Sequence, residues 1–243
     1  MSKLANKGAT MEEPSDETDF RVRAAKEKRE RMRKRLLEAT LAACSLETIR
    51  NPAMLEDVLK AADVSRGTFY KYFASLDEAI GELGHQLMRE MIDTVALVLR
   101  GLTDPRERVV AGPLMYLARA AQNPQWGVFV SRIEHLDAGG RERFIEQAIS
   151  HDLTEADREG VIAIPSLEAA IDLLVGASRQ AVLRIIAGGR RDLGHILALI
   201  TMSMMALGMT RRDAERSVSR TWKHIALRHA ETMPWVAELG RQA

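Results

Sequence analysis

Apolar residues recur at every third or fourth position along most of this chain, which is the spacing of amphipathic α-helices. The clearest stripes predict a first helix over about residues 32–44 and a long helix over about residues 76–99. Asp104-Pro105 and Asn123-Pro124 each place a capping side chain before a proline, which marks the start of a helix. No run of alternating apolar and polar residues indicates a strand, so the sequence predicts an all-α fold.

Residues 55–73 predict two short helices joined by a tight turn. The first helix has one apolar face, formed by Leu55, Val58, Leu59 and Ala62. Asp63 tolerates the left-handed backbone that the turn needs, and Ser65 is a good N-cap for a second helix over residues 66–73. Phe69 and Phe73 lie one turn apart and are expected to anchor that helix in the core. This arrangement predicts a helix-turn-helix domain that binds DNA.

The second short helix carries cations, hydroxyls and phenols on its outer face. Arg66 can donate two hydrogen bonds to a guanine, and Thr68 offers a hydroxyl and a methyl group to a thymine. Gly67 lets the backbone approach DNA closely. The predicted DNA-contacting residues are Arg31, Arg35, Ser65, Arg66, Gly67, Thr68, Tyr70, Lys71 and Tyr72. The alternative is an ordinary helical hairpin with a solvated basic face.

The run VSRGTFYKYF at residues 64–73, followed by SLDEAI at residues 75–80, resembles the tetracycline-repressor (TetR) family of bacterial transcriptional regulators. The resemblance covers about residues 31–83 and implies an all-helical homodimer with a ligand-sensing domain behind the DNA-binding domain. Three positions depart from the family's pattern. Met54 replaces the usual threonine cap, Asp63 the turn glycine, and Leu76 a phosphate-contacting lysine.

The net charge of the 243-residue chain is only +1, but its charges are unevenly distributed. Residues 1–20 are acidic and lack an apolar stripe, so we expect a disordered tail. A basic arm (either a DNA contact or a solvated helix end) and the helix-turn-helix domain occupy residues 21–83. We expect a helical regulatory and dimerisation domain at 84–232 and a tail at 233–243. Cys44, the single cysteine, fits a buried thiol in a reducing cytoplasm, and no membrane span is expected.

Two long apolar stripes in the last third of the chain predict a pair of closely packed helices separated by Gly188-Gly189. By the TetR resemblance, these helices from two subunits would form a four-helix dimer interface. The residues assigned to this interface are Leu167, Ile171, Leu174, Ser178, Val182, Leu193, Ile196, Leu197, Ile200 and Met204. The alternative is that the stripes complete the core of one subunit, and both can hold.

Methionine and aromatic side chains in the middle of the chain predict a pocket for a small apolar or amphipathic effector. The candidate lining residues are Met91, Met115, Tyr116, Trp126, Phe129, Arg132, Ile133 and His135. Arg132 and His135 are the expected polar anchors. The alternative is that each of these residues belongs to packed core.

Catalytic chemistry has little support in the sequence. The six histidines show no HExxH-like pairing and no cluster with carboxylates, and the nucleophile-elbow, dinucleotide and P-loop motifs are missing. We therefore predict no enzyme activity, no cofactor and no metal. The predicted function is a ligand-responsive repressor that binds a palindromic double-stranded DNA operator as a homodimer. Two alternatives are an architectural DNA-binding protein that senses no ligand and a helical enzyme with a vestigial DNA-binding domain.

Overall fold

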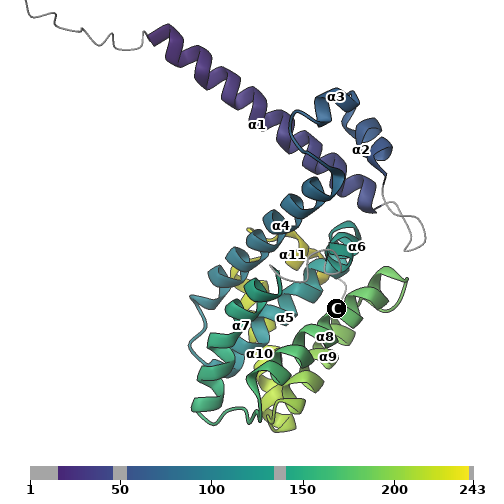
Figure 1. The fold of residues 1–243 in the computed structure, drawn as a ribbon. Coiled ribbons are helices and arrows are strands. Elements are labelled where there is room, and N and C mark those ends of the chain that lie inside the picture. Colours follow the sequence, from purple (N-terminus) through teal and green to yellow (C-terminus); the bar gives the residue numbers. More distant parts are fainter. Residues whose placement is uncertain (1–15, 46–53, 134–140, 241–243) are drawn as a thin grey trace, which may run out of the picture.

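The computed structural model describes residues 16–45, 54–133 and 141–240 and contains eleven helices in these ranges (Figure 1). In chain order they are α1 (Asp16–Ser45), α2 (Leu55–Ala62), α3 (Arg66–Phe69), α4 (Leu76–Leu99), α5 (Pro105–Gln122), α6 (Pro124–Ile133), α7 (Arg141–Arg158), α8 (Leu167–Ile186), α9 (Leu193–Ala206), α10 (Arg211–Arg228) and α11 (Pro234–Gly240). The described residues include no strand, which confirms the predicted all-α fold.

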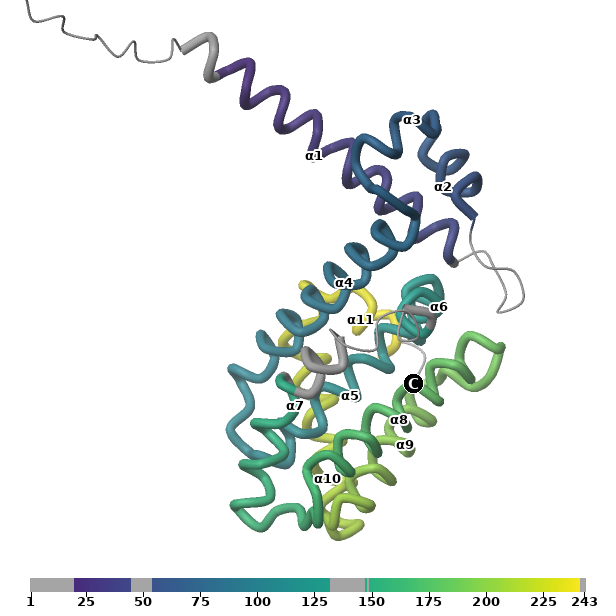
Figure 2. The backbone as a smooth tube through the Cα atoms, in the orientation of Figure 1, coloured from purple at the N-terminus to yellow at the C-terminus, as the bar shows by residue number. Residues whose placement is uncertain are grey.

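The N-terminal domain packs α2, α3 and the start of α4 against the second half of α1. The side chains of Leu36, Val58, Phe69 and Phe73 form its centre and are at most 1% exposed. Cys44 is buried, as predicted. The first half of α1 extends away from the rest of the molecule (Figure 2), and residues 20–31 are exposed.

Helix α1 corrects the predicted boundary of the acidic tail. It begins at Asp16, so residues 16–20 are helical rather than disordered, whereas residues 1–15 lie outside the described part of the chain. Acidic residues are favourable in the first turns of a helix, because unpaired backbone N–H groups give that end a partial positive charge. Residues 16–20 therefore form a helix although they have no apolar stripe.

Helix α4 connects the N-terminal domain to the rest of the molecule. Ser75 is its N-cap and accepts a hydrogen bond from the backbone N–H of Glu78, with an N–O distance of 3.1 Å. Its buried stripe first faces the N-terminal domain through Ala79 and Leu83, and then the C-terminal bundle through Met91 and Val98. The predicted bounds of this helix are confirmed.

The C-terminal bundle is built around α5, which contacts α4 and every helix from α6 to α11. Helix α6 in turn packs against both α1 and α4. The central position of α5 explains why apolar side chains are buried on most of its circumference. They are Val109, Val110, Ala111, Leu114, Met115, Leu117, Ala118, Ala120 and Ala121.

The end of the chain differs from the predicted tail at residues 233–243. Residues Pro234–Gly240 form α11, which packs against α5 and α10 with Met233, Val236 and Leu239 buried. Seven residues are too few for a recognisable apolar period, but Val236 and Leu239 lie three positions apart and share one face. Residues 241–243 lie outside the described part.

His224 on α10 is pressed against the turn that follows α4. A Cβ atom at Gly101 would lie 2.7 Å from Cε1 of His224. The Nε2 atom of His224 is buried without a hydrogen-bond partner in the described structure. Burial, and then the charges of His229 and Arg228, lower the pKa of His224 below its usual 6.5. The folded protein therefore favours the neutral imidazole.

This shift predicts a loss of stability on acidification. Between the lowered pKa and 6.5 the unfolded chain binds a proton at His224 that the folded protein does not. The free energy of unfolding should therefore fall as the pH drops below 6.5 and level off below the folded pKa. We expect urea denaturation of His224→Gln to show a smaller decrease between pH 7.5 and 5.5 than the wild type. An equal decrease in both proteins would assign the effect to other groups.

Candidate nucleic-acid interface and ligand cavity

The turn between α2 and α3 has the geometry that the sequence predicts. Asp63 adopts a left-handed backbone conformation, with φ 49° and ψ 55°. The backbone N–H of Val64 donates to the carbonyl of Leu59 at 3.1 Å, and that of Asp63 donates to Lys60 at 3.2 Å. These two bonds satisfy the last carbonyls of α2 and fix the direction in which the chain leaves it.

Helix α3 is shorter than the predicted span of residues 66–73. Ser65 caps it as predicted, since its hydroxyl oxygen accepts a hydrogen bond from the backbone N–H of Thr68 at 3.2 Å. After Phe69 the chain tightens: the N–H groups of Lys71 and Tyr72 donate to carbonyls three residues back, at 3.2 and 2.9 Å. Phe69 and Phe73 remain buried, with ring centroids 5.5 Å apart. The helix and the turn after it therefore share one anchored face.

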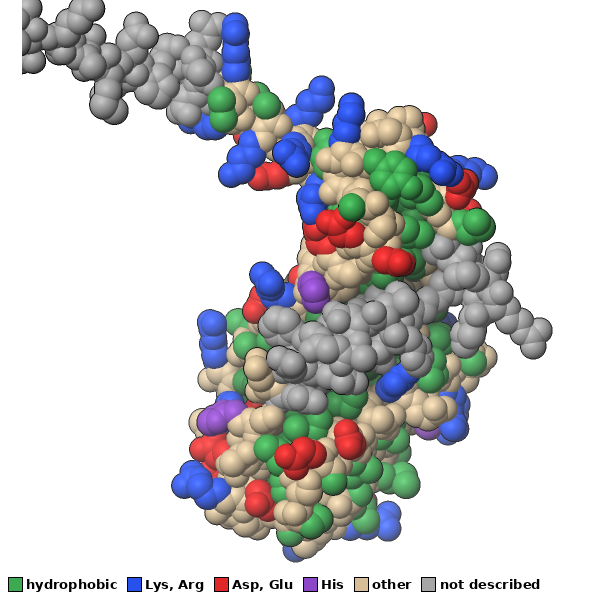
Figure 3. Space-filling view, in the orientation of Figure 1, with side chains coloured by type: hydrophobic (Ala, Val, Ile, Leu, Met, Phe, Trp, Pro, Cys, Tyr) green, Lys and Arg blue, Asp and Glu red, His purple; other side chains and the backbone are tan. Residues whose placement is uncertain are grey.

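The residues predicted to contact DNA lie around this short helix. Ser65, Arg66, Gly67, Tyr70 and Lys71 are exposed, whereas Thr68 and Tyr72 are partly buried. Figure 3 shows Lys and Arg side chains along α1 and around the α2–α3 end of the molecule, with acidic side chains among them.

Several of these cations are already paired. Arg66 forms an ion pair with Glu56 of α2. Arg35 of α1 lies 3.7 Å from the carboxylate of Asp63, and Arg31 lies 3.4 Å from that of Glu27. These exposed pairs are weak in water, so phosphates can compete for their cations at little cost.

Arg33 joins the three parts of this domain. Its Nε atom donates to Glu82 of α4 at 2.7 Å, and Nη1 donates to the carbonyl of Tyr72 at 3.1 Å. Its guanidinium lies 4.6 Å from the centre of the Phe73 ring. The bond to Glu82 raises the pKa of Arg33. In the sequence Arg33 is one cation of a basic run, and nothing local distinguishes it from its neighbours.

A cavity of about 340 Å³ lies between α4, α5, α7 and α8. Its walls are mostly apolar and are formed by Met88, Met91, Ile92, Val95, Ala96, Leu99, Arg108, Val109, Gly112, Pro113, Tyr116, Ile149, Asp152, Leu153, Leu174, Val175 and Ser178. The cavity thus begins one turn beyond the part of α4 that packs in the N-terminal domain.

Only part of the predicted pocket lines this cavity. Met91 and Tyr116 do, whereas Met115, Trp126 and Phe129 are buried in the core without reaching it. Trp126 instead packs edge-on against Tyr116, at a centroid distance of 5.2 Å, so it supports the wall from behind. The predicted residues Arg132, Ile133 and His135 cannot be assigned to a wall, because their side chains lie outside the described part. The described part of the wall contributes two charged residues that the sequence did not indicate, Arg108 and Asp152.

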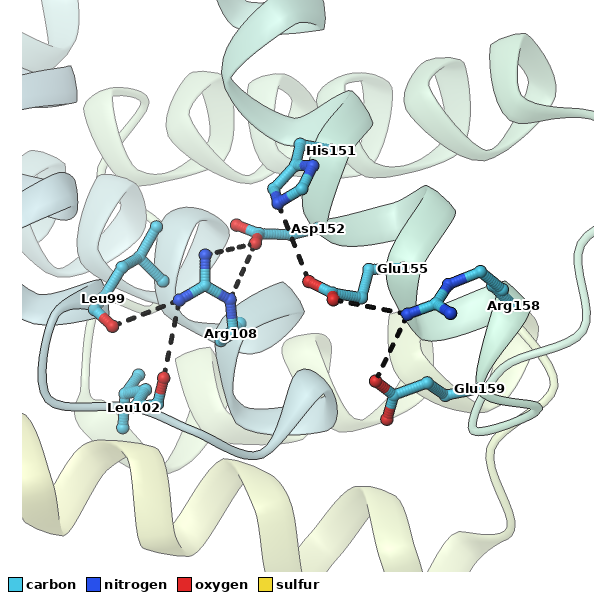
Figure 4. A network of polar contacts seen from close by, with 8 residues as sticks. All are labelled: Leu99, Leu102, Arg108, His151, Asp152, Glu155, Arg158 and Glu159. Atoms are coloured by element: carbon cyan, nitrogen blue, oxygen red, sulfur yellow. Dashed lines mark hydrogen bonds and ion pairs between the residues drawn. The ribbon is translucent and has the colours of Figure 1, made fainter.

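The polar end of the cavity is an ion pair between α5 and α7 (Figure 4). The Nε and Nη2 atoms of Arg108 donate to Oδ1 of Asp152 at 2.8 and 2.6 Å. Nη1 of Arg108 donates to the carbonyls of Leu99 and Leu102 at 3.2 and 3.4 Å. Asp152 is only 7% exposed. The sequence did not indicate this pair, because its members are 44 positions apart.

Asp152 also lies beside His151 and Glu155, a carboxylate–histidine group that the sequence did not predict. His151 is 3.6 Å from Glu155, and Glu155 is 3.6 Å from Arg158. Arg108 donates twice to Asp152, and Figure 4 draws no contact from Asp152 to His151 or Glu155. His151, Glu155, Arg158 and Glu159 form a separate set of contacts at the C-terminal end of α7.

Known structures share this arrangement of helices. RolR in complex with resorcinol superimposes with a TM-score of 0.60 and 18% identity, over 80% of this chain and 96% of that one. A TetR-family transcription regulator from Marinobacter aquaeolei VT8 gives 0.56 and 15%, over 82% and 97%. A γ-butyrolactone receptor (ArpA-like protein) gives 0.54 and 15%, over 80% and 97%. No protein-family model and no curated protein matches the sequence.

The chain has the TetR-family fold. The structural similarity covers 80% of the chain. The sequence motif covers only residues 31–83, so the similarity adds the C-terminal bundle to the part of the chain that has this fold. Identity of 18% or less limits this conclusion to the fold.

Within this TetR-family fold, the residues assigned to a dimer interface are mostly core of the subunit. Leu167 and Leu197 are partly buried, and the other eight are at most 8% exposed: Ile171, Leu174, Ser178, Val182, Leu193, Ile196, Ile200 and Met204. The most apolar stripe of α8 and α9 thus faces inward, where it forms part of the hydrophobic core of the bundle. A second stripe of apolar and small residues faces outward: Ala169, Leu173, Gly176, Ala198, Met202 and Met205.

Proposed function

We propose that this protein is a dimeric, sequence-specific DNA-binding regulator that represses transcription until a small ligand occupies its cavity. The observation that carries the proposal is the course of α4. Its N-terminal half packs beside α1 and is tied to Arg33, whereas its C-terminal half supplies six residues to the cavity wall. One rigid element therefore connects the candidate DNA-binding surface with the candidate ligand site.

Exposure and anchoring support the DNA-binding role of α3. Phe69 and Phe73 hold one face in the core, so Arg66 and Lys71 point to solvent where a major groove can receive them. Gly67 has an open surface, since a Cβ atom there would meet only Ser65 Oγ, at 3.9 Å. The backbone of α3 can therefore approach DNA closely at this position.

The outward stripe of α8 and α9 supports dimerisation. Met202 is 68% exposed, Met205 41% and Leu173 39%, and these side chains adjoin the small residues Gly176 and Ala198. Small residues allow two helices to approach closely, and a two-fold dimer would present two α3 helices to two half-sites of an operator.

The cavity supports a ligand response. An architectural protein without a ligand would be expected to have a filled C-terminal core, which the cavity of about 340 Å³ does not favour. Two proteins of the same fold are described with small organic ligands, resorcinol for RolR and a γ-butyrolactone for the ArpA-like receptor. A ligand can shift α4 only by its difference in affinity for the two conformations. No helix in the described ranges is long and apolar enough to cross a membrane.

Binding selection from random duplex DNA tests the DNA-binding half of this proposal. We expect a palindromic sequence to be enriched and its affinity to fall steeply with salt. Adding resorcinol, as a first small-molecule probe, to the complex then tests release. If no sequence is enriched with or without added ligands, the chain is not a sequence-specific regulator.

Substitutions in α3 should separate base contacts from phosphate contacts. We expect Lys71→Ala to weaken binding to all sequences and to lower the salt slope by about one per subunit. Arg66→Ala should cost about 1–3 kcal/mol and also relax the preference at one base pair. Fluorescence anisotropy with the selected operator and single-base variants measures both effects. Lys223→Ala, an exposed cation on α10, is the control. Equal losses for Arg66→Ala on specific and random DNA would contradict its base-reading role.

A further inference from the structure

Ser178 is an unpartnered polar group in a cavity wall that is mostly apolar. It lies on α8, is 8% exposed and lines the cavity beside Leu174 and Val175. Its hydroxyl forms no hydrogen bond with any described residue. Its Oγ atom is not among the enclosed polar atoms that lack a partner in the described structure, so the hydroxyl is open to the cavity, where a bound molecule can pair with it. The wall therefore offers a hydrogen-bonding position that the protein itself leaves unused.

Asp152 provides a second such position, on the neighbouring helix α7. Both hydrogen bonds from Arg108 reach Oδ1 of Asp152, and Oδ2 accepts none from the described residues (Figure 4). A carboxylate can accept hydrogen bonds at both oxygens, and bidentate pairing with an arginine would normally use both. Since Asp152 belongs to the cavity wall and its side chain is only 9% exposed, Oδ2 can accept a donor from a bound molecule.

The electrostatics of this wall favour a neutral molecule. Arg108 and Asp152 carry opposite charges and cancel each other. All three guanidinium nitrogens of Arg108 already donate to protein oxygens, so the cation is poorly placed to capture a carboxylate. An ionised ligand would bury a charge without a free partner, which is costly.

The remaining wall sets the size and shape of the molecule. Val109 and Pro113 both belong to the wall. Because proline has no N–H, Pro113 cannot donate the helical hydrogen bond to the backbone carbonyl of Val109. Met88, Met91 and Tyr116 contribute thioether and aromatic side chains to the wall, which suit contacts with an aromatic ring. An apolar cavity of about 150 Å³ holds benzene, so 340 Å³ corresponds to roughly 12–14 non-hydrogen atoms.

We infer that the cavity binds a neutral aromatic molecule of this size that carries at least two hydroxyl groups. One hydroxyl donates to Oδ2 of Asp152, and another exchanges a hydrogen bond with Ser178. This inference rests on the proposed function only in taking the cavity as the ligand site. It names the chemical class of ligand, which neither the fold nor the apolar composition of the wall specifies.

Isothermal titration calorimetry with the full chain tests this inference with matched probes. We would titrate a set of dihydroxynaphthalene isomers, their dimethyl ethers and naphthoate, which share one ring system of suitable size. At least one diol should bind at least about tenfold more tightly than its ether, because the ether has no hydrogen to donate. Stronger binding of the ethers or of naphthoate, or no binding by any diol, would overturn the inference.

Two variants locate the contacts. Ser178→Ala should weaken the best diol about fivefold and leave its ether unchanged, and Asp152→Asn should weaken the diol at least as much. Ser203→Ala is the matched control, because Ser203 is equally buried on α9 but bonds to the carbonyl of Leu199 at 3.0 Å, outside the cavity. Thermal melting without ligand confirms that each variant folds. If Ser178→Ala and Ser203→Ala behave alike, Ser178 is not a ligand contact.

Calorimetry also separates this inference from the proposed function, since it measures occupancy of the cavity without DNA. A diol that binds but leaves the operator complex intact would contradict the ligand response and support the ligand class. Release of the operator by an ether or by naphthoate, but not by a diol, would support the ligand response and contradict the ligand class.

Discussion

Arg108→Met is expected to lower the free energy of unfolding by about 3 kcal/mol, near the lower end of the range for breaking a buried ion pair. The substitution leaves the carboxylate of Asp152, whose side chain is 9% exposed, without its cation. It also removes the donor that holds the carbonyls of Leu99 and Leu102 at the end of α4. Urea denaturation measures the loss, provided that the slope of the transition is unchanged.

A double variant distinguishes the lost charge from lost packing. Arg108→Met combined with Asp152→Leu should recover most of the stability, because two apolar side chains replace the pair. Arg158→Met is the control: its guanidinium is 72% exposed and should contribute less than about 0.5 kcal/mol. If Arg108→Met alone lowers the free energy of unfolding by less than about 1 kcal/mol, water in the cavity already solvates Asp152, and the pair does not behave as a buried ion pair.

The sequence was most informative where a structural rule depends on neighbouring residues. The caps at Ser65 and Ser75, the left-handed turn at Asp63 and the extent of α4 each follow from residues within one or two helical turns. Phe69 and Phe73 were recognisable as anchors for the same reason. These features define the candidate DNA-binding surface, so its geometry could be predicted in outline.

The cavity could be predicted only as a class of site. Its polar end joins Arg108 on α5 to Asp152 on α7, and Ser178 approaches from α8. No local pattern relates these positions, and Ser178 was assigned to a dimer interface because it continues an apolar stripe. Trp126 was assigned to the pocket by its type, although packing places it behind Tyr116.

The proposed dimer interface illustrates how much an apolar stripe alone can indicate about a helix. A helix that packs on its own subunit and on a partner needs two faces, and the more apolar face is the one that the core takes. On α8 the outer face contains Ala169, Leu173 and Gly176, of which only Leu173 is a large apolar residue. The most apolar stripe therefore identifies the face that the core of the subunit takes, and the exposed fraction of each side chain is needed to find the outward face that we propose for the dimer.

Gly176→Arg is expected to convert the proposed dimer into monomers and to reduce operator affinity by about 100- to 10,000-fold. The loss follows because two linked α3 helices bind two half-sites with a high effective concentration, which a monomer lacks. A Cβ atom at Gly176 meets nothing within 4 Å in the subunit, and arginine favours a helix more than glycine does. The subunit should therefore remain folded. Sedimentation velocity measures the change in mass, and anisotropy measures operator binding.

Leu227→Arg is the matched control, since it adds the same charge at a side chain that is 84% exposed on α10. It should leave both the dimer and operator binding unchanged. A Gly176→Arg protein that remains dimeric and binds the operator normally would place the interface away from the outer face of α8. A monomeric protein that still binds the diol would instead show that the cavity is complete within one subunit. Ligand binding and dimerisation would then be separable, although both involve α8, which supplies Ser178 to the cavity and Gly176 to the outer face.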